Sequence, residues 1–293
     1  IKDNIIEKQG SNRYPNYQLV EITYKWEYLN QDLEEHILWT KDLSPLLGNL
    51  NNNIKDVCQY GFTEMANNVI DHSNAKKLSL VLLIDYLHVG IRVIDNGIGI
   101  FRKIKNDLGL EHSKHAILEL AKGKFTSDPD NHTGEGIFFT SRIFDYFIIE
   151  SHKLTFVGLG NDDGIFWEEK SDIPGTSVSM RIKKDSQVRL RDIFNEYADP
   201  DKDPSFHKTL IPVKLMEHEG ESLLSRSQAK RLITRFDRFI EVVLDFDGVK
   251  QIGQAFADQI FRVFANKHPD VNLVVMNTTK DVDNMIRRVQ TSR

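Results

Sequence analysis

Two apolar segments that follow an amphipathic one constrain the fold of this chain most strongly. "KLSLVLLIDY" and "HVGIRVIDN" are separated by almost no residues, which predicts an antiparallel hairpin. In residues 52–72, just before them, apolar side chains recur every three or four positions, which predicts one long helix. The second strand runs into "VIDNGIGI", where Gly97 and Gly99 follow Asp95. A carboxylate at the end of a buried strand implies a specific partner.

Further segments extend this pattern toward the middle of the chain. "KHAILELAKG" and "GEGIFFTSRIFDYF" are typical of helices, whereas "FIIESHK", "LTFVGLG", "GIFWEE" and "GTSVSMRIKK" alternate as four strands. A helix, a hairpin, a helix and several strands predict an α/β protein of the α+β sandwich type, with helices on one face of a mixed sheet. "IIEKQGSNRYPNYQLVE" predicts a separate hairpin near the start.

A polar segment rich in Asp and Pro, "NEYADPDKDPSFHK", predicts a domain boundary. Beyond it, strands and helices alternate from "TLIPVKLM" to "VDNMIRRVQ", which predicts a small α/β domain. We therefore expect a hairpin at 1–22, a large domain at 23–190, a linker at 191–205 and the small domain at 206–293.

Charge and cysteine content restrict the classes of function. A formal net charge of -5 gives no overall basic field, so a nucleic-acid contact would need a local patch. The single cysteine, Cys58, excludes an internal disulfide and favours the cytoplasm. No run of eighteen apolar residues predicts a membrane span. Because the chain begins with Ile1, we expect the natural start to lie upstream.

Three polar residues of the predicted helix form a candidate metal site. Glu64, Asn68 and Asp71 stand at i, i+4 and i+7 and therefore share one face. Carboxylate and amide oxygens can hold a hydrated Mg²⁺ and orient a water molecule. Taken alone, a solvated polar face is the simpler interpretation.

Asp95 is a candidate ligand-binding residue at the end of its strand. A carboxylate at the mouth of an apolar pocket accepts hydrogen bonds, and an exocyclic amine such as that of adenine is a matching donor. Gly97 and Gly99 would let the backbone approach a flat ring. As a single motif, Asp-x-Gly-x-Gly has low specificity.

Two more glycine motifs follow. In "TGEGIFF", Gly134 and Gly136 open a predicted helix and leave backbone N–H groups for a phosphate, although a helix start without a ligand explains them equally well. No Gly-Lys-Ser/Thr follows, so this is not a Walker P-loop. "PGTSVSM" places Gly175 and Thr176 at the start of a strand and by itself indicates only a turn.

Together the four motifs resemble a known family. In this order and spacing, "FTEMANNVIDHS", "VIDNGIGI", "TGEGIFF" and "GTSVSMRI" resemble the nucleotide-binding boxes of the GHKL ATP-binding superfamily, which includes gyrase, large heat-shock chaperones, histidine kinases and MutL. The resemblance spans about residues 30–183. It implies a Bergerat-type ATP-binding domain with ATP and Mg²⁺ as cofactors.

The resemblance also implies residue roles. Asp95 would accept a hydrogen bond from the adenine amine, with Thr176 assisting through water. Asn68 would ligate Mg²⁺, and Glu64 would polarise the attacking water as the general base. The remaining nucleotide-binding positions that it implies are Asp71, Gly97, Gly99, Gly134, Glu135, Gly136 and Ile137. The third glycine that many relatives carry in the second Gly box is absent here.

By the same resemblance, residues 101–133 correspond to a mobile lid over the nucleotide. Lys122 and Lys124 on this segment could reach a γ-phosphate, or they could be solvated. His112 and His115 are interpreted as surface residues of the lid. No phosphoacceptor histidine box precedes the domain, which argues against a sensor histidine kinase.

"VVLDFDGVKQIGQAFADQIFRVF" resembles the core of STAS domains, and most closely the STAS-like family that is fused behind GHKL domains. Anti-sigma-factor antagonists carry a phosphorylated serine where this chain has Gly253, Gln254 and Ala255, so no phosphoester is expected there. The resemblance implies a module that contacts the ATP domain or a protein partner around Gly253 and Gln254. A purely structural domain is the alternative.

The N-terminal hairpin resembles the wing of a winged-helix domain, with Lys8 and Arg13 near its tip. Basic residues of a wing meet phosphates, so DNA is an expected partner if a winged helix lies upstream. An ordinary hairpin packed on the ATP domain is an equally good interpretation.

Three functions therefore stay open. The leading one is a bacterial, cytoplasmic ATPase that binds and hydrolyses Mg·ATP as a conformational switch and signals to a protein partner through the STAS-like domain. The second is a protein serine kinase of the anti-sigma type. The third is a DNA-binding regulator that binds nucleotide without turnover. The sequence leaves homodimerisation and the pathway undetermined.

Overall fold

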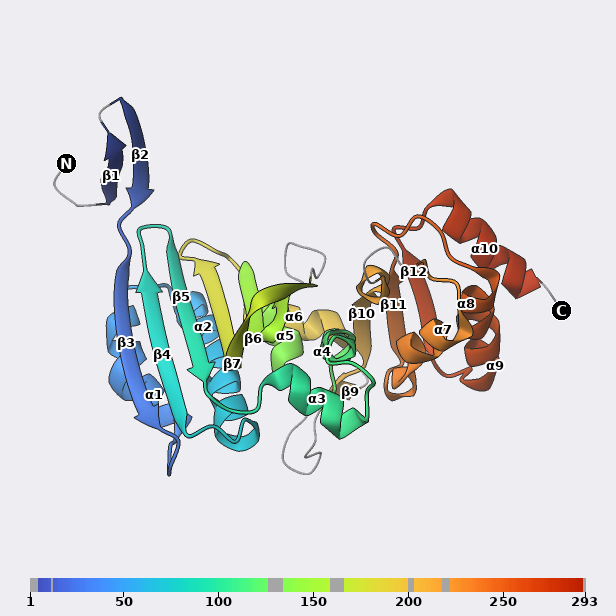
Figure 1. The fold of residues 1–293 in the computed structure, drawn as a ribbon, viewed down its shortest axis with the longest axis horizontal. Helices are drawn as coiled ribbons and strands as arrows, with labels where there is room; N and C mark the ends of the chain where they lie inside the picture. Colours follow the sequence, from blue (N-terminus) through green and yellow to red (C-terminus); the bar gives the residue numbers. More distant parts are fainter. Residues whose placement is uncertain are drawn as a thin grey trace. The chain divides into compact units, whose positions relative to one another are not determined.

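The computed structural model describes residues 5–11, 13–125, 134–158, 166–199, 203–217 and 222–291 (Figure 1). The chain forms two compact units. The first contains Ile1–Lys103, Phe139–Asn161 and Trp167–Leu190, and the second contains Ile104–Phe138, Asp162–Phe166 and Arg191–Arg293. We call them unit 1 and unit 2.

A five-stranded sheet in the order β3-β4-β5-β7-β6 forms the frame of unit 1 (Figure 1). The pairs β3–β4, β4–β5 and β5–β7 are antiparallel. The predicted hairpin is confirmed, because Leu78 pairs with Asp95 and Ile84 with Val89. The strands are β3 (Ile22–Leu29), β4 (Lys77–Ile84), β5 (His88–Asp95), β6 (Tyr146–Val157) and β7 (Phe166–Lys183).

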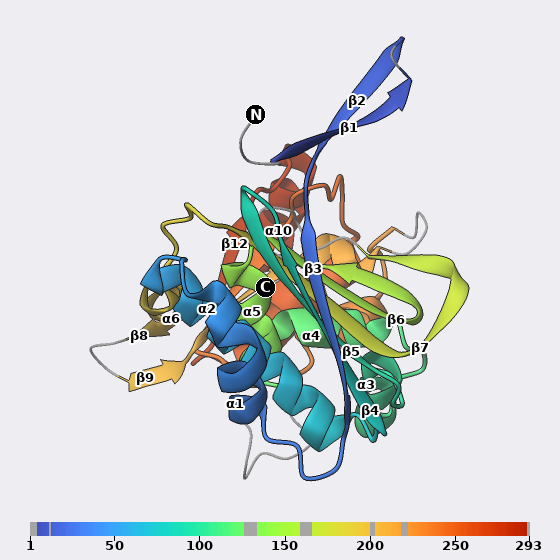
Figure 2. The ribbon, with the colours of Figure 1, turned by 90° about the vertical axis from the view of Figure 1, so that its left-hand side faces the viewer.

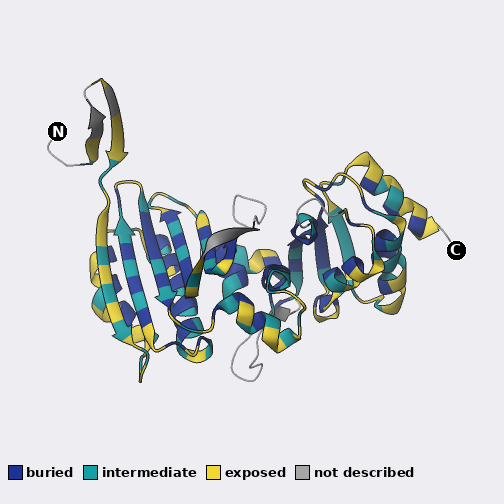
Figure 3. Ribbon diagram, in the orientation of Figure 1, coloured by how far each residue is buried: buried dark blue, intermediate teal, exposed yellow. Residues whose placement is uncertain are grey.

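Helices cover one face of this sheet, where α1 (Glu35–Leu38) and α2 (Asn52–Asn67) lie together (Figure 2). A π-helical turn, Asn68–His72, continues α2, so the predicted helix over 52–72 is confirmed with a change of geometry at its end. Strand residues alternate between buried and more exposed positions, with Leu78, Leu80 and Leu82 of β4 fully buried (Figure 3). The fold is an α+β sandwich, as predicted.

Close packing at Gly61 joins α2 to the sheet. A Cβ atom at Gly61 would lie 2.4 Å from the ring of Phe144 and 3.1 Å from the sulfur of Met180. Protein interiors are packed as densely as organic crystals, so a methyl group at this position would displace one of these side chains. Gly61 therefore fixes how closely α2 approaches β7.

Strands β6 and β7 are longer than the sequence predicts. β6 runs through both "FIIESHK" and the first part of "LTFVGLG" without a break. His152, inside this strand, has a positive φ of 53°. This local bulge interrupts the alternation that the prediction relied on, because a residue with left-handed φ no longer follows the two-residue period of a strand. The sequence therefore suggested two strands where there is one.

Two elements, β3 and α3 (Ile100–Leu108), were not predicted from the sequence. β3 is the edge strand of the sheet, and its side chains are exposed or half-exposed along its length. α3 is largely polar. A one-sided apolar pattern in so short a segment gives a weak periodic signal.

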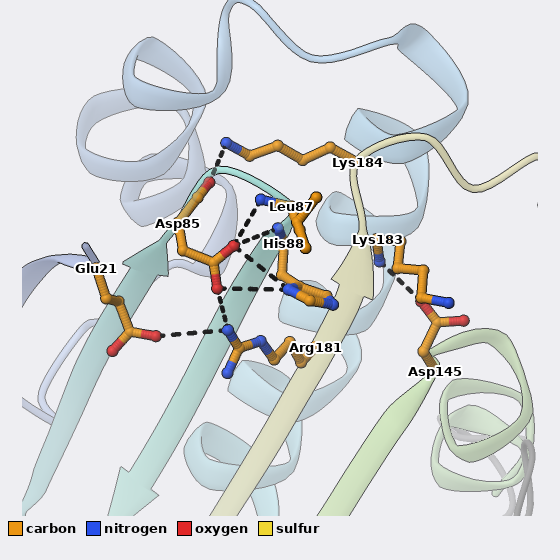
Figure 4. Close-up of polar contacts among 8 residues, drawn as sticks. All are labelled: Glu21, Asp85, Leu87, His88, Asp145, Arg181, Lys183 and Lys184. Carbon is orange, nitrogen blue, oxygen red and sulfur yellow. Dashed lines mark hydrogen bonds and ion pairs between the residues drawn. The ribbon is translucent and has the colours of Figure 1, made fainter. Parts of the chain in front are cut away.

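The turn between β4 and β5 is fixed by a polar cluster around Asp85 (Figure 4). Its Oδ1 accepts hydrogen bonds from the N–H groups of Leu87 (2.7 Å) and His88 (2.6 Å), and Arg181 of β7 pairs with its Oδ2. Lys184 donates to its backbone carbonyl. Burial raises the pKa of Asp85, but the two N–H groups and the Arg181 charge outweigh burial, so the pKa lies below its usual value. These contacts hold the β4–β5 turn in place and join it to β7.

Unit 2 contains a parallel three-stranded sheet in the order β10-β11-β12. The predicted alternation of strands and helices is confirmed. Its elements are β10 (Lys208–Pro212), α7 (Arg226–Ile233), β11 (Glu241–Asp245), α8 (Gln254–Asp258), a π-helical segment (Gln259–Phe264), α9 (Ala265–Lys267), β12 (Asn272–Met276) and α10 (Lys280–Thr291). A capping box of Ser225 and Gln228 begins α7. Where the sequence predicts a longer strand at "TLIPVKLM", a 3₁₀ turn, Val213–Met216, follows β10.

The segment expected to be a linker, 191–205, belongs to unit 2. It contains most of α6 (Leu190–Tyr197), β8 (Ala198–Asp199) and part of β9 (Asp203–Phe206). Tyr197 and Phe206 are buried and pack against the ring of Phe138, with ring centroids 5.0 Å and 4.3 Å away. The segment thus contributes the aromatic side chain of Tyr197 to the core of unit 2.

Helix α4 (His115–Lys122) corrects the prediction of a mobile lid at 101–133. Every residue from Ala116 to Lys122 is buried, and α4 packs against β10 in unit 2. The hydroxyl of Thr209 on β10 donates to the carbonyl of Lys122 at 2.7 Å. The apolar residues of "AILELA" thus make α4 a core helix, and the one acid among them, Glu119, is buried with them. The tip of the expected lid, 126–133, lies outside the described residues.

The predicted N-terminal hairpin is confirmed. β1 (Ile6–Ser11) pairs antiparallel with β2 (Tyr14–Leu19). Its resemblance to a DNA-binding wing stays a prediction. Among the residues that the structure describes, none of the helices combines the length and the apolar character needed to cross a bilayer.

Candidate functional site

Asp95 ends β5 with its side chain almost completely buried, since only 5% of the residue is exposed. Its Oδ1 accepts a hydrogen bond of 2.6 Å from the N–H of Gly97. Burial raises the pKa of Asp95, and hydrogen bonds from Gly97 and Thr176 oppose this only in part, so the pKa lies above its usual value. A buried carboxylate of this kind gains from any further donor that approaches it.

Three elements hold the turn that follows Asp95. The N–H of Ile98 donates to the carbonyl of Ser73, at the end of the π-helical turn, at 2.9 Å. The N–H of Ile100 donates to the hydroxyl of Thr176 on β7 at 3.0 Å. The carbonyl of Ile98 lies 3.0 Å from Nε2 of His152 on β6. The structure thus brings the helix end and the strand ends together around one turn.

The glycines of this turn are required by close contacts with protein atoms. A Cβ atom at Gly97 would lie 2.1 Å from the carbonyl oxygen of Ser73. At Gly99, which has a φ of 84°, a Cβ atom would lie 2.5 Å from Nε2 of His152. From the sequence, both glycines are expected to let a ligand ring approach the backbone. The structure supplies a different reason, since side chains here would separate the turn from its neighbours.

Gly175 and Thr176 lie next to Asp95, inside β7 rather than at the start of a strand. Gly175 has a φ of 74°, and a Cβ atom there would lie 2.1 Å from the carbonyl oxygen of Asp95. Its own carbonyl accepts a hydrogen bond of 2.7 Å from the hydroxyl of Ser151. The pair that the sequence associates with Asp95 is therefore adjacent to it in space.

Glu64 and Asn68 lie one turn apart at the end of α2, where the N–H of Asn68 donates to the carbonyl of Glu64. Both residues are half-buried. Asp71 is exposed within the π-helical turn, where the wider spacing no longer follows the i, i+4, i+7 rule. π-helical turns occur frequently at functional sites. Because Ser73 ends this turn and contacts Ile98, the helix end is joined directly to the Asp95 turn.

The second glycine motif lies at the start of α5 (Gly136–Ile143). Its residues Gly134, Glu135, Gly136 and Ile137 are half-buried and belong to unit 2. Gly134 has a φ of 71°, and its carbonyl accepts a hydrogen bond from the N–H of Phe125 at 3.2 Å. A Cβ atom at Gly134 would lie 2.2 Å from the carbonyl oxygen of Phe125. Glycine is therefore needed here for the backbone to close on Phe125.

Neither interpretation of Lys122, a contact with a γ-phosphate or a solvated side chain, fits the structure. Its side chain is fully buried, and Nζ donates to Oε1 of Glu119 at 2.6 Å. Nζ also donates to the carbonyls of Arg231 and Thr234, each at 3.0 Å. Burial lowers the pKa of Lys122, and the nearby Glu119 opposes that effect. Oε2 of Glu119 accepts a hydrogen bond of 2.9 Å from Arg235, so Glu119, Lys122 and Arg235 form a buried ionic triad.

Lys124 and His115 also have neighbours in unit 2. Nζ of Lys124 donates to the carbonyl of Arg238 at 3.1 Å. Nε2 of His115 lies 3.0 Å from a guanidinium nitrogen of Arg231. His115 is half-buried, so the interpretation of His115 as a surface residue is wrong. His112 is exposed, as predicted.

Sequence reasoning did not identify three residues that hold the Asp95 turn, namely Ser73, Asn96 and His152. Oδ1 of Asn96 accepts hydrogen bonds from the N–H groups of Lys76 and Lys77, both at 3.0 Å. An Asn at a turn is a recognisable signal for such contacts. His152 is more than fifty positions from its partner Ile98 and has no local signal.

The start of α8 in unit 2 is partly covered. The N–H of Gly253 donates to the carbonyl of Leu223 at 2.7 Å, and a Cβ atom at Gly253 would lie 2.8 Å from the Cα atom of Leu224. The segment before α7 therefore packs over Gly253. Gln254, the first residue of α8, is exposed.

Comparison with known protein families identifies one part of the chain. Residues 228–283 match the family model described as "STAS-like domain of unknown function (DUF4325)". The match begins within α7 and ends at the start of α10, so it includes β11, β12 and the helices between them. No curated protein matches the chain. The chain thus carries a STAS-like domain at residues 228–283.

Proposed function

We propose that this chain is a nucleotide-dependent switch, in which the residues of the four GHKL-like motifs bind Mg·ATP and the STAS-like domain signals to a protein partner. The observation that supports it most is the buried carboxylate of Asp95, in a turn held by Ser73, Thr176 and His152. Together with the resemblance of the four motifs to GHKL boxes, this arrangement favours an adenine amine as the ligand of Asp95.

The carboxylate of Asp95 has acceptor positions left for the amine of a purine. An ionised carboxylate offers about four acceptor positions, and Gly97 and Thr176 occupy only part of them. A further N–H donor would lower the cost of keeping this carboxylate ionised in a buried place. Thr176, whose hydroxyl accepts from Ile100, would assist through a water molecule.

By the GHKL resemblance, groups other than Asp95 would hold the magnesium ion and the phosphates. Asn68 would ligate Mg²⁺, and Glu64 would polarise a water molecule. Within the described ranges, no group of three or more His, Cys, Asp or Glu residues is placed to hold a metal ion. Mg²⁺ in nucleotide sites takes most of its ligands from phosphate and water, so one protein oxygen is compatible with binding. Gly134, Glu135, Gly136 and Ile137 would offer N–H groups to the phosphates.

Signalling through unit 2 is supported by α4. The corresponding segment would be part of the ATP lid, yet α4 is built into the core of unit 2 beside β10. A ligand shifts a conformational equilibrium only by binding two states unequally. If nucleotide changes the position of α4, the ionic triad transmits that change to α7, where the STAS-like match begins.

Turnover tests the role of Glu64. With ATP labelled on its γ-phosphate, we expect the wild type to release labelled phosphate. Glu64→Ala should keep its ATP affinity and lose turnover by about 10²–10⁴-fold, because a positioned general base contributes that much. Asp56→Asn, an exposed acid of the same helix, is the matched control and should leave turnover unchanged.

The fate of the label separates the alternatives. Label that appears on a second protein would favour the kinase, and bound ATP without release would favour the regulator that does not turn it over. Equal phosphate release by wild type and Glu64→Ala would contradict the role given to Glu64.

A further inference from the structure

A bulge in β6 directs two neighbouring side chains to the same point. In a regular strand, adjacent side chains point to opposite faces of the sheet. Here a Cβ atom at Gly99 would lie 2.6 Å from the hydroxyl of Ser151 and 2.5 Å from Nε2 of His152. The positive φ of His152 is the local cause, because it breaks the alternation of the strand. Both side chains therefore reach the turn that follows Asp95.

The imidazole of His152 lies between two acceptors. Nε2 is 3.0 Å from the carbonyl oxygen of Ile98, and Nδ1 is 3.0 Å from Oδ1 of Asp172 on β7. A carbonyl and an ionised carboxylate can only accept hydrogen bonds. Both contacts are therefore hydrogen bonds only when both ring nitrogens carry a proton. A neutral ring makes one of them and leaves the other nitrogen facing an acceptor.

The charged groups that face this ring come from three elements. Asp172 on β7 is in direct contact, and Asp95 on β5 is close enough for His152 to lower its pKa. Arg102 on α3 lies 3.9 Å from the second oxygen of Asp172 and helps to hold that carboxylate in place. Only 15% of the His152 side chain is exposed, so the ring has little freedom to turn away.

The backbone of His152 is strained, since left-handed φ is unfavourable for residues other than glycine. Strain of this kind persists where the surroundings fix it, and it is concentrated at binding and active sites. In this chain the strained backbone places the imidazole against the carbonyl of Ile98, three residues after Asp95. The strained backbone conformation of His152 is therefore needed for this contact with the turn.

We propose that His152 is a positioning residue for the adenine nucleotide: in its doubly protonated form, held by Asp172, it fixes the carbonyl of Ile98 and with it the Gly97–Gly99 turn beside Asp95. This inference rests on the proposed function. It makes the nucleotide affinity depend on pH. When the ring loses the Nε2 proton and keeps its Nδ1–H on Asp172, the hydrogen bond to the carbonyl of Ile98 is lost, the turn loosens and ATP is bound less tightly.

The test compares the wild type with His152→Gln at several pH values. A Gln amide can donate to the carbonyl of Ile98 but does not titrate. At pH 6 the Gln amide replaces the Nε2 donor, so we expect the two proteins to bind Mg·ATP with about equal affinity. At pH 8 the wild type should bind about fivefold more weakly than His152→Gln, because its neutral ring has lost one hydrogen bond. The ratio of the two dissociation constants cancels the titration of the nucleotide.

His88→Gln is the matched control, because His88 also faces a carboxylate, Asp85, at the other end of β5. Its affinity relative to wild type should not change with pH. A ratio for His152→Gln that is constant from pH 6 to pH 8 would overturn the proposal.

Hydrogen exchange without nucleotide separates this inference from the proposed function. After correction for intrinsic rates, the amides of Ile98 and Ile100 should be better protected at pH 6 than at pH 8 in the wild type, and equally protected in His152→Gln. If the wild type shows this protection but binds no ATP, the proposed function fails and the positioning role stands. If ATP binds and neither protection nor affinity depends on His152, the positioning role fails alone.

Discussion

Lys122→Met is expected to lower the free energy of unfolding of unit 2 by about 3–5 kcal/mol, the usual cost of removing one partner from a buried ion pair. The change leaves Glu119 paired with Arg235 alone, and it removes the donor of the carbonyls of Arg231 and Thr234. Met has a similar length, so the loss of packing is small. The effect should therefore arise from the unpaired polar groups.

Hydrogen exchange measured on peptides from 115–122 and 226–233 localises this effect to unit 2. Lys230→Met is the matched control, since Lys230 is an exposed lysine of α7 and its replacement should change stability by less than about 0.5 kcal/mol. If Lys122→Met lowers the free energy of unfolding no more than Lys230→Met does, the triad does not stabilise the docking of α4.

Gly97→Ala is expected to weaken Mg·ATP binding by about tenfold or more. The new Cβ atom would lie 2.1 Å from the carbonyl oxygen of Ser73 and 2.9 Å from Oδ1 of Asp95. The turn must then move away from the helix end, which breaks the hydrogen bond from Ile98 to Ser73. Overpacking of this kind costs about 1–3 kcal/mol, and each 1.4 kcal/mol is tenfold in affinity.

Gly48→Ala is the control for this prediction. Gly48 has a negative φ of -54°, and the nearest atom that a Cβ would meet is 3.6 Å away, so that substitution should leave ATP affinity unchanged. Isothermal titration of both variants makes the comparison. Wild-type affinity in Gly97→Ala would mean that the turn does not shape the nucleotide site.

The sequence predicts the elements whose patterns are local. The helix over 52–72 and the hairpin that ends at Asp95 were predicted because their apolar periods are long and regular. β3 was not predicted, because an exposed edge strand has little apolar contrast between its two faces. The bulge at His152 was not predicted either, because it depends on contacts with the distant residues Ile98 and Asp172.

The candidate site is predictable in part for the same reason. The resemblance of the motifs associated Asp95 with Thr176, and the structure places them side by side. The burial of Lys122 could not be predicted, because lysines are almost always exposed and the carbonyls of Arg231 and Thr234 that accept its hydrogen bonds lie more than a hundred residues away. Whether Glu64 and Asn68 act on a nucleotide stays a prediction.

Binding of Mg·ATP to the wild type and to Asp95→Asn, measured by titration calorimetry, decides whether Asp95 recognises an adenine nucleotide. The substitution preserves shape but replaces acceptor lone pairs with an amide group that donates, so an adenine amine would meet a donor in place of an acceptor. We expect the wild type to bind ATP, Asp95→Asn to bind at least about a hundredfold more weakly, and both proteins to have the same melting temperature within a few degrees. Equal affinity in the two proteins, or no binding by a folded wild type, would contradict the claim that Asp95 recognises an adenine nucleotide.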